Sequence, residues 1–179
     1  MTYRCNWTDD RLPVWMNYAR HLKGEPVKAL EIGAFEGRST VWILENILTH
    51  PDARIVCLDP FVPNKGLDLP ADVADNYLAR FVENTKFHRS KVRILQAYSW
   101  EVTAEWLAPF GPFDLVYVDA SHWPEETVRE AEMAWQVCKP GALLIFDDYG
   151  GTLKEYIERW RVRAEKLHES QQMISRVVK

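Results

Sequence analysis

The segment from Val27 to Thr40, VKALEIGAFEGRST, constrains the fold of this chain more than any other. It begins as an apolar run, passes Glu31 and turns through Gly33 and Gly37. An amphipathic run follows directly, and its apolar residues share one helical face: Val41, Leu44, Ile47 and Leu48. A strand, a glycine turn and a helix in this order predict the first unit of a doubly wound α/β sheet, in which small ligands bind at the carboxyl ends of the strands.

The size and composition of the chain fit one globular domain. It has 179 residues, of which 47% are hydrophobic and 27% charged, so we expect a single domain over residues 1–179. The net charge of -4 argues against nucleic acid as the main partner. No apolar run is long enough for a membrane span, and the polar N-terminus does not resemble a signal peptide. Three scattered cysteines without metal-ligand spacing fit a reducing, cytoplasmic location.

Strands alternate with helices along the chain, which predicts a mostly parallel sheet. We expect strands over residues 27–32, 54–58, 91–96, 113–118 and 142–146, and two short antiparallel strands between 165 and 179. Helices are expected over 8–23, 39–49 and 99–107, and from about residues 71, 124 and 152. Residues 1–26 would form an N-terminal helical segment, and residues 60–86 a lid over the acceptor region. Three residues are expected to cap helices: Thr8, Ser99 and Thr152.

The glycine turn favours one type of cofactor over another. It has two of the three glycines of the dinucleotide fingerprint, and Glu36 would place negative charge beside a phosphate, so a nicotinamide-dependent reductase is disfavoured. A ligand with an amino-acid head and a ribose fits better. The helix N-terminus can receive a carboxylate, and Glu31 can pair with an ammonium, directly or through water.

Asp59 closes the second expected strand. A carboxylate only accepts hydrogen bonds, which suits the two adjacent hydroxyls of a ribose. The alternative is that Asp59 merely starts a turn with Pro60. We favour the ribose role, because strand, spacing and residue type agree.

With this turn and Asp59, the chain resembles the class I S-adenosylmethionine-dependent methyltransferases from about Val27 to Tyr149. The form EIGAFEGRS is similar to the metal-dependent O-methyltransferases of the catechol type and to the bacterial cephalosporin and macrolide-sugar O-methyltransferases. Two later segments match that group, VYVDASH at 116–122 and LLIFDDY at 143–149. Ala120 and Ala142 stand where glycines are frequent, and these changes are small.

The resemblance implies a Rossmann-like sheet in the order 3-2-1-4-5-7-6, with the seventh strand antiparallel and helices on both faces. It also implies S-adenosylmethionine as the methyl donor, and that Ser99 and its neighbours border the adenine. Trp100 either stacks on the adenine or is an ordinary aromatic. The residues expected at the donor are Glu31, Gly33, Ala34, Phe35, Gly37, Ser39, Asp59, Pro60, Ser99, Trp100 and Asp119.

Three carboxylates end neighbouring strands. Asp119 closes the strand at 113–118, and Asp147 and Asp148 close the strand at 142–146. Neighbouring strands lie about 4.8 Å apart, so the three can converge, where they would repel one another unless a cation intervenes. Mg²⁺ prefers such oxygen ligands, and in the resembling enzymes an ion here lowers the pKa of the substrate hydroxyl. The alternative is that Asp148 caps a turn and Asp119 only borders the donor; we favour a metal at all three.

His122, three positions after Asp119, is the expected general base. Catechol-type enzymes place a lysine there, so the residue type departs from the family while the position does not. The alternative is a loop histidine that fixes Trp123 or the start of the next helix. We therefore expect Asp119 and His122 to be the catalytic residues, with Trp7 and Trp123 near the acceptor.

The sequence thus predicts an O-methyltransferase that acts on a small molecule with help from Mg²⁺ or another divalent cation. An oxygen acceptor is preferred because the segment after Val118 lacks the Asn/Asp-Pro-Pro-Tyr run frequent in amino-methylating enzymes. A metal-independent enzyme acting on RNA or protein, and a non-catalytic donor-binding protein, stay open. The acceptor's identity and the oligomeric state, a homodimer included, also stay open.

Overall fold

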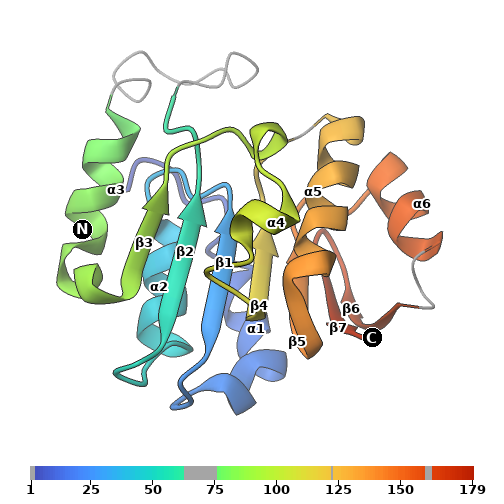
Figure 1. Cartoon of the computed structure of the whole chain (residues 1–179), viewed down its shortest axis with the longest axis horizontal. Helices are drawn as coiled ribbons and strands as arrows, with labels where there is room; N and C mark the ends of the chain where they lie inside the picture. The colour runs from blue at the N-terminus through green and yellow to red at the C-terminus, as the bar shows by residue number, and fades with distance from the viewer. Residues whose placement is uncertain (1–2, 63–75, 122, 160–162) are drawn as a thin grey trace.

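Seven strands pair in the order β3-β2-β1-β4-β5-β7-β6, which confirms the topology expected from the sequence (Figure 1). The structure is a computed structural model and describes residues 3–62, 76–121, 123–159 and 163–179. The strands β1 to β5 run parallel, and β7 pairs antiparallel with both β5 and β6. The strands span Lys28–Ile32 (β1), Arg54–Leu58 (β2), Val92–Leu95 (β3), Phe113–Val118 (β4), Cys138–Phe146 (β5), Ala164–Glu169 (β6) and Met173–Val177 (β7).

Helices cover both faces of the sheet (Figure 1). On one face pack α1 (Leu12–Ala19), α2 (Arg38–Asn46) and α3 (Tyr77–Thr85), and on the other α4 (Ala104–Leu107), α5 (Pro124–Val137) and α6 (Gly151–Arg159). Short 3₁₀ turns lie at Arg20–Leu22, Lys86–Lys91 and Ser99–Glu101. Alternation along β1 produces the two cores, because Leu30 and Ile32 face one side and Ala29 the other. No helix among the described residues is both long and apolar enough to cross a membrane.

Several expected boundaries were wrong. Thr8 does not cap α1 with its side chain; its carbonyl oxygen accepts the N–H groups of Arg11 and Leu12, and the helix begins only at Leu12. Ser99 starts a short 3₁₀ turn instead of a continuous helix, because its hydroxyl donates to Glu130, and Thr103 caps α4 instead. The strand β5 starts at Cys138 and not at 142, and a register shift against β4 accommodates the extra residues.

Other expected features lie partly outside the described residues. Residues 63–75, which hold about half of the expected lid and the expected start of its helix, are among them, as is His122. The last helix begins at Gly151, and the Thr152 side chain, expected to cap it, is also outside the described set.

Trp15 anchors α1 to the sheet. Its side chain is fully buried, its ring meets the edge of Tyr117 on β4 at 4.6 Å between centroids, and its indole N–H donates to Gln172 at 2.8 Å. Large aromatic side chains contribute strongly to such packing. The position of α1 fixes where the preceding residues, 3–11, can run.

Candidate functional site

A cavity of about 410 Å³ lies at the carboxyl ends of β1, β2, β4 and β5. A cavity of this size is typical of a small-molecule or cofactor site. The residues that line it are Cys5, Trp7, Thr8, Arg11, Gly33, Ala34, Phe35, Arg38, Ser39, Asp59, Pro60, Val62, Tyr77, Asp119, Ala120, Asp147 and Asp148. Of the eleven residues expected at the donor, seven therefore line the cavity: Gly33, Ala34, Phe35, Ser39, Asp59, Pro60 and Asp119.

Gly33 brings the end of β1 against the end of β4. Its backbone has φ of 89°, and an added Cβ atom would lie 2.0 Å from the carbonyl oxygen of Asp119. Only glycine fits this approach. Gly37 adopts φ of 81° at the N-terminus of α2, so the two glycines shape the turn that the cavity uses.

Phe35, between these glycines, contributes an aromatic wall. Its ring stacks on Trp7 at 5.7 Å between centroids and meets Tyr77 edge-on at 4.9 Å. Trp7 thus lines the cavity, as the sequence led us to expect, although its role toward an acceptor stays a prediction. Trp123 is 71% exposed and is not among the lining residues of the described chain.

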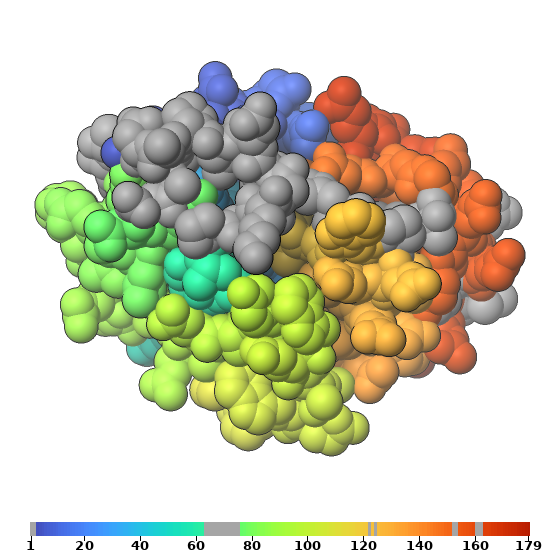
Figure 2. All heavy atoms as spheres, turned by 90° about the horizontal axis from the view of Figure 1, so that it is seen from above, coloured from blue at the N-terminus to red at the C-terminus, as the bar shows by residue number. Residues whose placement is uncertain are grey.

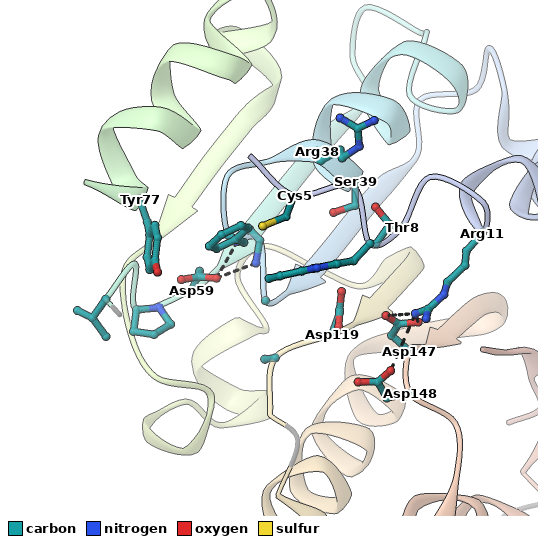
Figure 3. Close-up of a pocket in the computed structure, with 17 residues that line it drawn as sticks. Cys5, Thr8, Arg11, Arg38, Ser39, Asp59, Tyr77, Asp119, Asp147 and Asp148 are labelled. Atoms are coloured by element: carbon teal, nitrogen blue, oxygen red, sulfur yellow. Dashed lines mark hydrogen bonds and ion pairs between the residues drawn. The ribbon is translucent and has the colours of Figure 1, made fainter. Parts of the chain in front are cut away.

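Asp59 holds the glycine turn and faces the cavity (Figure 3). One carboxylate oxygen accepts the N–H groups of Ala34 at 2.8 Å and Phe35 at 2.9 Å, and the other accepts that of Phe61 at 2.6 Å. Burial raises the pKa of Asp59, while these three backbone donors oppose the rise. A carboxylate has about four acceptor positions, so one stays available to a ligand hydroxyl.

Glu31 lies beneath the turn and is fully buried. It accepts hydrogen bonds from the hydroxyls of Ser39 and Thr40 in the first turn of α2. Burial raises the pKa of Glu31 to about 7, and the two hydroxyl donors oppose this rise. Because Glu31 does not line the cavity and Ser39 does, Ser39 lies between the buried acid and the cavity.

Ser99 and Trp100 lie away from the cavity walls of the described chain. Ser99 donates to Glu130 of α5, and Glu130 also accepts the N–H of Ser121 at 3.4 Å. Trp100 stacks on Tyr98 at 4.2 Å between centroids and is 50% exposed. Seen from above in Figure 2, the yellow-green residues around 100 lie on the opposite side of the molecule from the blue N-terminal residues. Their contact with an adenine stays a prediction.

The structure brings the three expected acidic residues together at the cavity (Figure 3). The Tyr117 hydroxyl donates to Asp119 at 2.8 Å. Burial, and then the charge of Asp147, raises the pKa of Asp119 well above its usual range. The Asp148 side chain is 54% exposed. A cation bound here would therefore favour the ionised form of Asp119.

Arg11 supplies a positive charge to this group, and the sequence analysis missed it (Figure 3). Its Nη1 donates to both carboxylate oxygens of Asp147 at 2.5 and 2.7 Å and lies 3.9 Å from Asp148. Gln172 donates to the same carboxylate at 2.8 Å. No motif could have identified Arg11, because its partners lie far away in sequence.

The acidic residues as arranged do not fit a metal site built from all three carboxylates. Both oxygens of Asp147 are already engaged by Arg11 and Gln172. Within the described ranges, no group of three or more His, Cys, Asp or Glu side chains lies together in a way that could hold a metal ion.

The segment of residues 3–11, here called the N-terminal strap, runs over the glycine turn. The Arg4 N–H donates to Glu36 at 2.9 Å, and Asp9 pairs with Arg38. Glu36 itself is buried and also pairs with Arg80 at 2.7 Å. Glu36 was expected to place negative charge beside a bound phosphate, and this expectation was wrong, because its carboxylate pairs with Arg80 and does not line the cavity.

A family model described as a methyltransferase domain matches residues 30–149, which contain the glycine turn and all three strand-end acids. The chain belongs to this methyltransferase family. It is an S-adenosylmethionine-dependent methyltransferase, as the three sequence segments had indicated. No curated protein matches the chain.

Solved structures share the fold of this methyltransferase at low identity. One described as an O-methyltransferase from Klebsiella pneumoniae has a TM-score of 0.67 at 16% identity, covering 99% of this chain and 82% of its own. Cofactor-bound Rv0187 from MTB has a TM-score of 0.66 at 16% identity, covering 99% and 83%. The MycE methyltransferase of the mycinamycin biosynthetic pathway, in complex with Mg and SAH, has a TM-score of 0.63 at 18% identity. This match covers 99% of this chain and 51% of the MycE chain.

Proposed function

We propose that this methyltransferase transfers the methyl group of S-adenosylmethionine to a hydroxyl of a small molecule. The observation that carries the proposal is the position of Asp59, which faces the cavity while it holds the glycine turn at the ends of β1 and β2. An acceptor-only group beside a turn and a helix N-terminus suits a nucleoside that carries an amino-acid head.

The residues around the cavity divide the recognition of the donor. Asp59 would accept a hydrogen bond from the ribose, and the N-terminus of α2 with Ser39 would receive the carboxylate. Asp119, buried and without a cationic partner of its own among the described contacts, would meet the positive charge of the donor. That charge would in turn favour the ionised form of Asp119.

When bound, the sulfonium supplies an activated methyl group that an oxygen nucleophile takes by in-line displacement, so the C–O bond forms as the C–S bond breaks. The chain's own residues then need to orient the hydroxyl and accept its proton. His122 stays the proposed base, because an imidazole three positions after Asp119 in the sequence is a suitable proton acceptor. The aromatic wall of Trp7, Phe35 and Tyr77 would pack against apolar parts of the ligands and exclude water.

A hydroxyl acceptor assisted by a divalent cation is the second candidate. The observation in its favour is the presence of Mg in the complex of MycE, a protein of the same fold. Against it stand the engaged oxygens of Asp147. We propose a small molecule over RNA as the acceptor because the net charge of -4 offers no electrostatic attraction to phosphates.

Titration calorimetry with S-adenosylmethionine tests the donor, comparing the wild type with Asp59→Asn. Asparagine keeps the shape of the side chain but removes charge and acceptor capacity, so donor affinity should fall about tenfold or more. Asp52→Asn removes an exposed aspartate at the opposite end of β2 and should leave affinity unchanged. Absence of donor binding by the wild type would contradict the proposal.

The acceptor is tested by release of S-adenosylhomocysteine against panels of phenols, sugar hydroxyls, amines and RNA. Turnover with a hydroxyl compound, lost on acetylation of that hydroxyl, is the expected result. Turnover only with amines or RNA would overturn the oxygen acceptor. Donor binding without turnover on any panel would favour the non-catalytic alternative.

A further inference from the structure

We propose that Arg11 is the built-in cation of the acidic site and excludes a divalent ion from it. Nη1 of Arg11 contacts both carboxylate oxygens of Asp147, at 2.5 and 2.7 Å, and so places a permanent positive charge where a metal would need a carboxylate oxygen. The inference concerns cation binding alone and does not depend on the identity of the methyl acceptor.

Contacts on two sides hold this ion pair in place, a buried one through Gln172 and an exposed one through Gln171. Gln172 donates to Asp147 at 2.8 Å and accepts the indole N–H of Trp15 at 2.8 Å, while Arg11 also donates to Gln171 at 2.9 Å. The Asp147 side chain is 7% exposed. An exposed pair exchanges readily with solvent ions, whereas a pair fixed within a buried network does not.

Asp148 lies within the field of the same guanidinium. Arg11 Nη1 is 3.9 Å from Asp148, and a guanidinium keeps its positive charge at any physiological pH. A divalent ion at Asp148 would thus meet a like charge a few ångströms away. Arg11 and a metal therefore compete for one set of carboxylates.

Arg11 also has a positioning role, because it belongs to the N-terminal strap. Trp7 and Thr8 of the strap line the cavity, and α1 begins immediately after Arg11. The ion pair with Asp147 thus fixes the strap to the end of β5, across the acidic edge of the cavity (Figure 3).

Titration with Mn²⁺ tests the competition between Arg11 and a metal directly. The electron paramagnetic resonance signal of the free ion measures how much Mn²⁺ is bound. The wild type and Arg11→Lys, which keeps the charge, should show no specific site at about 1 mM Mn²⁺, well above the affinity range of tight protein sites. Arg11→Met, similar in length but neutral, should bind Mn²⁺ at least about tenfold more tightly than the wild type. Asp147→Asn in the Arg11→Met background should abolish the gain.

Arg176→Met is the matched control, because it removes an exposed arginine paired with Glu165 on the β6–β7 hairpin and should gain no site. Circular dichroism establishes that each variant is folded; if Arg11→Met is not, Arg11→Gln replaces it as the neutral variant. Specific Mn²⁺ binding by the wild type that Asp147→Asn or Asp148→Asn removes would overturn the proposal. A folded neutral variant with no gain would overturn it too. Donor calorimetry on the same samples reports separately on the proposed function.

Discussion

At the scale of single residues, the site depends on positions where only one residue type satisfies the local geometry. Gly33 is the clearest, because its missing side chain lets the end of β1 touch the backbone of Asp119. The sequence identified this glycine from its place in a strand–turn–helix pattern. It did not reveal that the close neighbour would be β4, since that contact joins segments far apart in the chain.

Gly33→Ala should destabilise the fold and remove donor binding. The new Cβ atom would lie 2.0 Å from the Asp119 carbonyl oxygen, and neither backbone can yield without moving a strand end. Left-handed backbone adds strain for alanine. Thermal unfolding and donor calorimetry measure both effects, and Gly24→Ala, also left-handed but with open space around it, separates strain from the clash. Equal losses in the two variants would contradict the explanation.

Glu31 should give the protein a distinct pH dependence of stability. Its pKa rises from 4.5 to about 7 on folding, so its contribution is fully present below pH 4.5 and is lost as the pH rises through 7. The loss amounts to roughly 3 kcal/mol. Urea unfolding at pH 5 and at pH 8 should show that the free energy of unfolding declines less between these pH values for Glu31→Gln than for the wild type. Glu25→Gln, an exposed control, should keep the wild-type profile.

At the scale of elements, the strands followed from the sequence far better than the helix boundaries did. Buried strands of the parallel sheet are continuous apolar runs, as at 113–118, and these are readable locally. Ser99 was misassigned as a helix cap because its partner, Glu130, lies on α5 and is invisible to a local pattern. The contacts of the strap were missed for the same reason, because the residues that bind Arg11 and Glu36 lie far from them in the sequence.

The buried carboxylate of Glu36 should decide whether the strap stays in place. Glu36→Gln weakens the contacts to the Arg4 N–H and to Arg80. Loss of one partner of a buried ion pair lowers the free energy of unfolding by about 3 kcal/mol, which urea unfolding measures. Hydrogen exchange within residues 3–11 should accelerate as well. Glu83→Gln, which breaks an exposed pair with Lys86, should change neither the free energy of unfolding nor the exchange rate within residues 3–11. Unaltered exchange in the strap would show that its other contacts suffice.

At the scale of the whole molecule, the sheet brings four strand ends to one edge and so gathers residues from Cys5 to Asp148 around one cavity. Sequence analysis could predict this convergence, because parallel strands of a doubly wound sheet all end on the same side. It could not predict how the charges are balanced there. That balance depends on Arg11 and Gln172, which reach Asp147 from the two ends of the chain.

Donor binding should therefore stabilise the entire domain, since the cavity joins the strap, the glycine turn and the ends of β4 and β5. At a donor concentration 100 times the Kd, binding adds about 2.7 kcal/mol, which for a domain of this size raises the Tm by roughly 5 to 10 °C. S-adenosylhomocysteine should act similarly, and Asp59→Asn should require more donor for the same rise. NADH should leave the Tm unchanged, because the turn lacks the third glycine of a pyrophosphate site. MgCl₂ alone should also leave the Tm unchanged, because Arg11 supplies the cation of the acidic site. A rise in Tm with NADH but not with S-adenosylmethionine would contradict the assignment of the cavity to the methyl donor.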